Sequence, residues 1–349
     1  MELLQTKGMN NLEIIKSFEI VKTEEWPDYD LKITLKPCFR CNHRCWFCDE
    51  YDNKTKTWTK EQCDNVLDKL AEIPKSKKKI FFYFYGGQPT LSKYWEYLNY
   101  RIVELFPERE LFLQTHTNLS LSTSRLEKFL KEINRIKPTN HTVNICNSYH
   151  IGKQTVEEYV KKMDICKKYS SLGYCFFSTE IPKKEQMLKE LHFIAKKYPK
   201  KLIMKFTEIE NLSLHNYKGY EKFKDDDYLI GKDNGKSLEY RYCMKYYPEL
   251  RMYFEKGWDF IIDGDKVINY SDVKGNNIHK NFKYMKCESG KKNIVIDYTL
   301  KIYRCNDYNY KNIKPLSLHE LDFKTYLSKC EICLLNACFD GLDFKKVKL

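Results

Sequence analysis

Six strand-like apolar segments alternate with helical segments over about the first 210 residues, and this alternation limits the fold more than any other feature. Branched and aromatic side chains dominate these short segments, as they do in buried strands. Neighbouring strands that are connected by helices run parallel, with right-handed crossovers. The sequence therefore predicts an α/β fold with a parallel sheet. We expect its strands at residues 31–36, 80–85, 110–114, 141–147, 174–178 and 202–207.

The segments between these strands have the periodicity of amphipathic helices. The first helix should begin after Thr59, whose hydroxyl can accept a hydrogen bond from a free N–H of the first turn. Its apolar positions recur at intervals of three and four residues, so they share one face. We expect helices at residues 59–73, 94–105, 124–133, 155–170 and 184–197.

A loop with three cysteines follows the first predicted strand, at Cys41, Cys45 and Cys48. Three thiolates on one loop can hold three irons of a [4Fe–4S] cube and leave the fourth iron open. Zinc normally takes four nitrogen or sulfur ligands in two close pairs, and this spacing fits that pattern poorly. The loop indicates an iron–sulfur cluster, with zinc or simple buried cysteines as the alternatives.

A glycine pair ends the second predicted strand, in the segment Gly86-Gly87-Gln88-Pro89. Together with the cysteine loop, this segment resembles the radical S-adenosylmethionine (SAM) superfamily. That family has the signature Cys-x3-Cys-x2-Cys with an aromatic residue before the last cysteine, here Phe47, and a Gly-Gly-Glu-Pro motif. Gln88 replaces the usual glutamate, which keeps an acceptor oxygen but removes a charge. The resemblance implies that the SAM-binding residues are Phe47, Gly86, Gly87, Gln88 and Pro89.

Polar residues end the next predicted strands, where a barrel enzyme builds its active site. Asn118 lies in a segment that resembles the Thr-Asn-Gly of many relatives, with Leu119 in place of glycine. Ser148 resembles the serine that contacts the SAM ribose or carboxylate in relatives. As an alternative, a polar residue that closes a strand is usually a turn or a helix cap. The candidates for substrate contact or proton transfer are His116, His150 and Glu180.

The pattern changes beyond residue 210 to a charged segment and then to short alternating strands. Two hairpins are expected, at residues 260–268 around Asp263-Gly264 and at residues 294–305. Four cysteines of this tail could hold one closed cluster, or a zinc ribbon as the alternative. They are Cys287, Cys305, Cys330 and Cys333, with Cys338 and Cys243 as rival ligands.

The arrangement of the tail is similar to the twitch domain, a shortened SPASM domain that follows the barrel in many radical SAM enzymes. The resemblance as a whole implies a partial (β/α)6 TIM-type barrel followed by a small cysteine-rich α+β domain of twitch/SPASM type. We expect an N-terminal extension at residues 1–30, the barrel at 31–210, a connecting segment on the substrate side at 211–260, and the twitch/SPASM-like domain at 261–349.

The composition of the chain indicates its cellular location and the use of its cysteines. It has 349 residues, 14 cysteines and a formal net charge of +13. It contains no segment of about 18 consecutive apolar residues and no signal peptide, so we expect a cytoplasmic protein without a membrane anchor. Metal or redox use of the cysteines then fits better than disulfides. Nucleic acid is a possible partner that we do not favour, because lysine-rich runs are usually solvated surfaces.

The resemblance implies an enzyme that reductively cleaves SAM to a 5′-deoxyadenosyl radical, which takes a hydrogen atom from the substrate. An auxiliary [4Fe–4S] cluster would accept an electron, so we expect an oxidoreductase of the dehydrogenase type. It would use an electron donor such as flavodoxin or ferredoxin. About 30 residues precede the first strand, too few for a leader-binding domain, which favours a small molecule or nucleotide as substrate. The alternatives are a SPASM-type peptide-modifying maturase and a non-catalytic cysteine-rich metal-binding scaffold or sensor.

Overall fold

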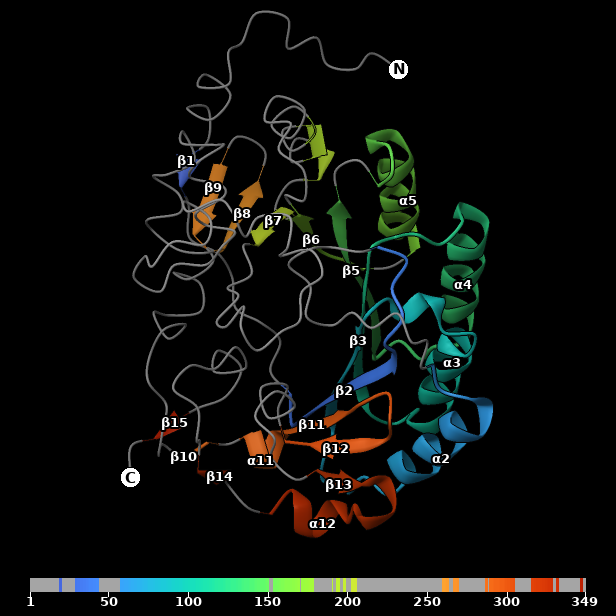
Figure 1. The fold of residues 1–349 in the computed structure, drawn as a ribbon, viewed down its shortest axis with the longest axis vertical. Helices are drawn as coiled ribbons and strands as arrows, with labels where there is room; N and C mark the ends of the chain where they lie inside the picture. Colours follow the sequence, from blue (N-terminus) through green and yellow to red (C-terminus); the bar gives the residue numbers. More distant parts are fainter. Residues whose placement is uncertain are drawn as a thin grey trace, which may run out of the picture.

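The computed structural model describes a little more than half of the chain (Figure 1). The described residues are 19–20, 29–43, 57–150, 153–169, 171–178, 190, 193–194, 197–198, 202–205, 259–263, 266–269, 286–287, 289–304, 315–328, 331–332 and 346–347.

Six parallel strands form the centre of the sheet, and they confirm the predicted alternation. Each pairs in parallel with the next in chain order, so every connection is a crossover. The strands are β2 (Leu31–Cys38), β3 (Lys79–Gly86), β4 (Glu110–Thr117), β5 (His141–His150), β6 (Ser171–Ser178) and β7 (Leu202–Lys205).

Later segments of the chain extend this sheet at both edges. The strands β8 (Asp259–Asp263) and β9 (Lys266–Asn269) form an antiparallel hairpin on β7, and β1 (Glu19–Ile20) pairs with β9. At the other edge β11 (Asn293–Ile296) runs parallel to β2 and forms a hairpin with β12 (Lys301–Tyr303), which pairs with β13 (Leu316–Ser317). Both predicted hairpins are confirmed. Among the residues that the structure describes, this sheet has twelve strands, in the order β1-β9-β8-β7-β6-β5-β4-β3-β2-β11-β12-β13.

A small second sheet lies in the tail. Its strands are β10 (Lys286–Cys287), β14 (Glu331–Ile332) and β15 (Lys346–Val347), with β10 in the middle and antiparallel to both neighbours. The division of the chain into domains stays a prediction.

Four helices line one face of the parallel strands (Figure 1). The first helix begins at the predicted N-cap, Thr59, which forms a capping box: Thr59 Oγ1 accepts from the Gln62 N–H at 3.2 Å, and Gln62 Oε1 accepts from the Thr59 N–H at 2.9 Å. Of the predicted helix at 184–197, residues 190, 193–194 and 197 are described, and all are helical. The long helices are α2 (Lys60–Ala71), α3 (Trp95–Leu105), α4 (Thr123–Ile136) and α5 (Val156–Tyr169); the short ones are η1 (Pro89–Leu91), α11 (Ser289–Lys292), η5 (Leu318–Glu320) and α12 (Phe323–Tyr326).

The two faces of the parallel strands differ in polarity. Trp95 of α3 donates to Thr115 Oγ1 at 3.1 Å, which shows that odd-numbered positions of β4 face the helices. Because side chains alternate along a strand, Gln114 and His116 lie on the opposite, inner face. Gln114 accepts there from Asn144 of β5 at 2.9 Å. The helix-facing side holds the apolar core, and the inner face carries polar side chains beside aromatic ones such as Phe81 and Phe112.

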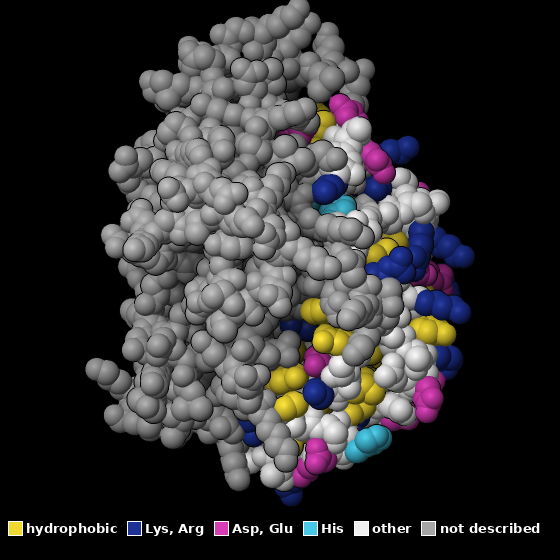
Figure 2. All heavy atoms as spheres, viewed as in Figure 1, with side chains coloured by type: hydrophobic (Ala, Val, Ile, Leu, Met, Phe, Trp, Pro, Cys, Tyr) yellow, Lys and Arg dark blue, Asp and Glu magenta, His cyan; other side chains and the backbone are white. Residues whose placement is uncertain are grey.

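The described surface over the helices has mixed charge. Figure 2 shows Lys and Arg side chains interspersed with Asp and Glu on this side of the molecule. Several of them pair, such as Lys60 with Asp64 at 2.7 Å and Arg125 with Glu96 at 2.6 Å. Within the described ranges, no helix combines the length and apolar character needed to cross a bilayer.

Candidate active site

The carboxyl ends of the parallel strands bring the predicted site segments to one edge of the sheet. Cys38 at the end of β2 pairs with Gly86 at the end of β3, and Thr117 at the end of β4 pairs with Asn147 of β5. The cysteine loop leaves β2 at this edge, and Cys41 is its described cysteine. Active sites of barrel enzymes form at this end of the strands.

The glycine pair packs against the start of the cysteine loop. The Gly87 N–H donates to Cys38 O at 3.1 Å, and the Gln88 N–H donates to Arg40 O at 2.8 Å. A Cβ atom on Gly87 would lie 2.4 Å from Phe39 O, which is closer than a side chain can approach a backbone oxygen. Gly86 has a φ of +105°, a conformation that suits glycine. In this chain the glycines therefore allow the loop to be held by backbone hydrogen bonds.

Gln88 joins the ends of β3 and β4. Its side chain is 1% exposed, and its Oε1 accepts from the Asn118 N–H at 2.9 Å. Because that backbone group can only donate, the amide orientation is fixed, and Nε2 points to two hydroxyls. Nε2 donates to Thr90 Oγ1 at 2.5 Å and to Thr117 Oγ1 at 2.6 Å. Both Oε1 and Nε2 of the neutral amide therefore have hydrogen-bond partners.

Asn118 faces the cysteine loop. Its Nδ2 donates to Asn42 Oδ1 at 2.9 Å and lies 3.9 Å from Cys41 Sγ. The next residue, Leu119, has a φ of +53° and is fully buried. Glycine, which the Thr-Asn-Gly motif has at this position, adopts this left-handed conformation without the steric cost that leucine has. Leu119 keeps the turn and adds an apolar side chain to the core.

His116 lies between two hydroxyls on the inner face. Its Nδ1 is 3.0 Å from Tyr83 Oη of β3, and its Nε2 is 2.8 Å from Ser148 Oγ of β5. A neutral imidazole donates from one ring nitrogen and accepts at the other. The three side chains thus form a hydrogen-bonded chain across three strands. Ser148, predicted to contact SAM, has His116 as its partner here.

His150 and His43 form a buried pair beside this chain. Their ring centroids are 4.8 Å apart in an edge-to-face arrangement, and each side chain is 8% exposed. Burial, with help from the charges of His43, His116 and Lys153, lowers the pKa of His150 to about 3. Burial and the Lys153 charge lower the pKa of His43 to about 4. Both rings are neutral at neutral pH, which makes His150 a weak proton acceptor.

The remaining predicted site residues are placed only in part. Pro89 is buried and begins η1, while Cys287 lies in β10, and the structure describes only its backbone. The other predicted residues lie outside the described residues, which leaves their roles as predictions. They are Cys45, Phe47, Cys48, Glu180, Cys243, Cys305, Cys330, Cys333 and Cys338.

Sequence reasoning missed four residues that contact the site. Asn42 and His43 lie within the cysteine loop, and this position was a signal that they would be near the cluster. Gln154 and Lys162 donate to the backbone carbonyls of Asn118 and Leu119 at 3.0 Å and 2.8 Å. Lys162 is one of many lysines on amphipathic helices, so no local pattern marks it.

The described part of the cysteine loop fits an iron–sulfur ligand. Cys41 Sγ accepts from the His43 N–H at 3.4 Å and faces Asn118 Nδ2, and N–H donors of this kind stabilise a thiolate. Within the described residues no three metal-ligating side chains come together, and two of the three loop cysteines lie outside them. The donor chemistry therefore suits the cluster that the sequence predicts.

Comparisons with known proteins match part of this chain to one family. Residues 35–203 match the family model of the radical SAM superfamily, and no curated protein matches the sequence. The structure of anSMEcpe with bound AdoMet and Cp18Cys peptide has a TM-score of 0.50 at 16% identity, over 86% of this chain and 80% of that one. This likeness shows a shared fold.

Two other solved structures have lower scores. BtrN in complex with AdoMet and 2-DOIA has a TM-score of 0.43 at 12% identity, over 87% of this chain and 83% of that one. SuiB of Streptococcus suis bound to precursor peptide SuiA has a TM-score of 0.38 at 15% identity, over 86% of this chain and 65% of that one. The family match implies a [4Fe–4S] cluster and SAM. Residues 35–203 thus match a radical SAM domain and lie on a mostly parallel α/β fold.

Proposed function

We propose that the enzyme oxidises a small molecule or nucleotide by two electrons, with a second [4Fe–4S] cluster in the tail as electron acceptor. When bound, the first cluster and SAM supply a 5′-deoxyadenosyl radical, and the second cluster takes up one electron. The substrate loses one hydrogen atom to this radical, then one proton and one electron, so the product has one additional double bond. Cys41, Cys45 and Cys48 hold the first cluster.

One observation carries the proposal of a second cluster: the register of the small sheet. Cys287 of β10 lies opposite Glu331 of β14. In the sequence, Glu331 directly follows Cys330 and precedes Cys333 by two residues. Paired antiparallel residues have Cα atoms about 5 Å apart. The backbone pairing of Cys287 with the strand that Cys330 precedes and Cys333 follows in the sequence supports the proposal that these cysteines share a cluster. The fourth, Cys305, follows β12 by two residues.

The inner face supports a proton-transfer role for His116. It is more exposed than His150 and has hydroxyl partners at both ring nitrogens. A proton taken up at one nitrogen can be matched by release from the other, so the chain through Tyr83 and Ser148 can carry a proton away from the substrate. His116 is therefore the proposed acceptor of the substrate proton.

Iron and sulfide analysis after anaerobic reconstitution tests the proposal. We expect about eight irons in the wild type and about four in a Cys41→Ala/Cys45→Ala/Cys48→Ala variant. A Cys287→Ala/Cys305→Ala/Cys330→Ala/Cys333→Ala variant should also retain about four. If the wild type binds about four irons and holds zinc in the tail, the second cluster and the oxidation it supports are wrong.

A further inference from the structure

The Asn118 amide approaches the sulfur of a predicted iron ligand. Asn118 is 5% exposed and follows β4 at the edge of the sheet where the cysteine loop lies. Its Nδ2 is 3.9 Å from Cys41 Sγ, and one of its two hydrogens is used by Asn42 Oδ1 at 2.9 Å. The other hydrogen is available to the sulfur. Cys41 Sγ thus faces a side-chain N–H as well as the backbone N–H of His43 at 3.4 Å.

The orientation of this amide is fixed by its own loop. The Ser120 N–H donates to Asn118 Oδ1 at 3.0 Å. Since a backbone N–H can only donate, the oxygen must occupy that position, and Nδ2 must point to the cysteine loop. A flipped amide would lose this hydrogen bond and the one to Asn42.

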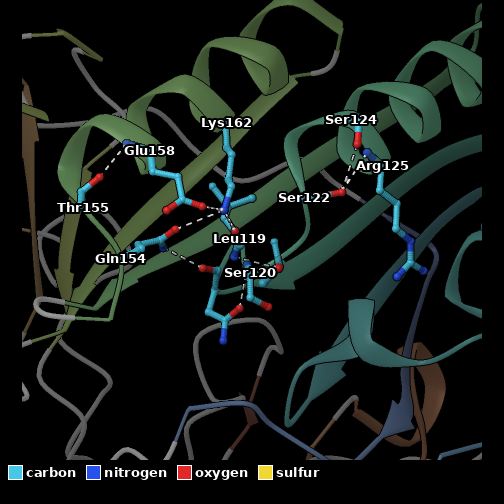
Figure 3. Close-up of polar contacts among 11 residues, drawn as sticks. Leu119, Ser120, Ser122, Ser124, Arg125, Gln154, Thr155, Glu158 and Lys162 are labelled. Atoms are coloured by element: carbon cyan, nitrogen blue, oxygen red, sulfur yellow. Dashed lines mark hydrogen bonds and ion pairs between the residues drawn. The ribbon is translucent and has the colours of Figure 1, made fainter.

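Helix α5 holds the backbone of the same turn from the other side. Gln154 Nε2, just before the helix, donates to Asn118 O at 3.0 Å, and Lys162 Nζ donates to Leu119 O at 2.8 Å. Figure 3 shows both side chains directed at the turn, with Glu158 beside the Lys162 ammonium at 2.9 Å. Lys162 is 3% exposed, so this donor is held in a fixed position inside the protein.

We propose that Asn118 is a positioning residue that donates an N–H···S hydrogen bond to Cys41 and raises the reduction potential of the cluster bound there. The inference rests on the proposed function, because it needs a cluster on Cys41. Reduction places an additional electron on the cluster and makes its sulfurs more negative. A hydrogen bond to a ligand sulfur becomes stronger in the reduced form, so it favours reduction.

The test is a redox titration of the reconstituted full-length protein, followed by electron paramagnetic resonance. Each cluster that becomes reduced takes one electron from dithionite. The signal to follow is the one that changes when SAM is added, since only a cluster with an open iron binds it. Asn118→Leu removes both donors at similar size, and Asn118→Asp replaces them with a negative charge. Asn140→Leu is the matched control, because Asn140 donates to Pro107 O and Arg109 O at the opposite end of the sheet.

At the potential where half of the wild-type cluster is reduced, Asn118→Leu should lower the ratio of reduced to oxidised cluster about fivefold. Asn118→Asp should lower it further, and Asn140→Leu should leave it unchanged. A wild-type ratio in both Asn118 variants would overturn the inference. Loss of iron from both variants, with Asn140→Leu fully loaded, would also overturn it in favour of a purely structural role. A wild type without any SAM-sensitive signal would instead contradict the proposed function itself.

Discussion

Gln88 stands where the Gly-Gly-Glu-Pro motif has glutamate, and its contacts explain why the change is tolerated. The buried amide gives one acceptor to Asn118 N–H and two donors to threonine hydroxyls. A hydroxyl can turn to donate as well as accept. The same three partners could therefore bind a glutamate carboxylate, and the site does not require the family's charge.

This arrangement predicts how two substitutions at Gln88 differ. Gln88→Met leaves the Asn118 N–H without a partner in a buried place, which should lower the free energy of unfolding by about 1–3 kcal/mol. Gln88→Glu keeps all three contacts if both hydroxyls turn, so its loss should be clearly smaller. Urea denaturation of the two variants beside the wild type measures both values. Equal losses for Met and Glu would show that the hydroxyls do not adapt.

His150 makes stability depend on pH. Its folded pKa of about 3 lies below the usual value near 6.5, chiefly because burial disfavours the charged ring. A lowered histidine pKa means that the unfolded chain binds the proton first. The contribution of neutral His150 to the free energy of unfolding is complete above pH 6.5. It is lost as the pH falls towards 3, by several kcal/mol in total. His43 adds a second loss of the same sign, because its pKa is about 4.

The measurement is the free energy of unfolding of the cluster-free protein from pH 7 down to pH 3.5. His150→Gln should make the fall with decreasing pH shallower, with a residual slope from His43. His319→Gln, at an exposed position, is the matched control and should keep the wild-type slope. If His150→Gln and wild type fall in parallel, His150 is not the group responsible.

At the scale of elements, the sequence predicted the parallel strands and their helices because each has a strong local pattern. The predicted strand at 141–147 is β5 in the structure and continues to His150. The sequence did not predict this continuation, because Ser148 and His150 are polar and polar residues after an apolar run are typical of a loop. The extension matters, since it moves both residues from a loop onto the sheet.

The turn after β4 shows what local patterns leave out. The resemblance to Thr-Asn-Gly identified Asn118, but its contacts with Asn42 and Gln88 join segments 76 and 30 residues away. The donors that hold this turn are Lys162 of α5 and Gln154 just before that helix. Such partners depend on how crossovers place helices over strands, which periodicity does not specify. The candidate site was therefore predictable as a list of segments and less so as a set of contacts.

At the scale of the whole molecule, the two ends of the large sheet come from distant parts of the chain. The hairpin of β11 and β12 was predicted from its own alternation, but its parallel pairing with β2 joins residues more than 250 positions apart. Nothing in either strand alone specifies that partner. The consequence concerns the site: β11 lies beside the strand that leads into the cysteine loop, so the tail supports the loop through the sheet.

The central claim is that this protein cleaves SAM on a cluster held by Cys41, Cys45 and Cys48. The direct measurement is the release of 5′-deoxyadenosine and methionine from SAM by anaerobic, reconstituted, dithionite-reduced protein. We expect release in wild type even without substrate, slowly, and none in the Cys41→Ala/Cys45→Ala/Cys48→Ala variant. Intact SAM after incubation with reduced protein that carries its full complement of iron would contradict the account and favour a metal-binding scaffold or sensor.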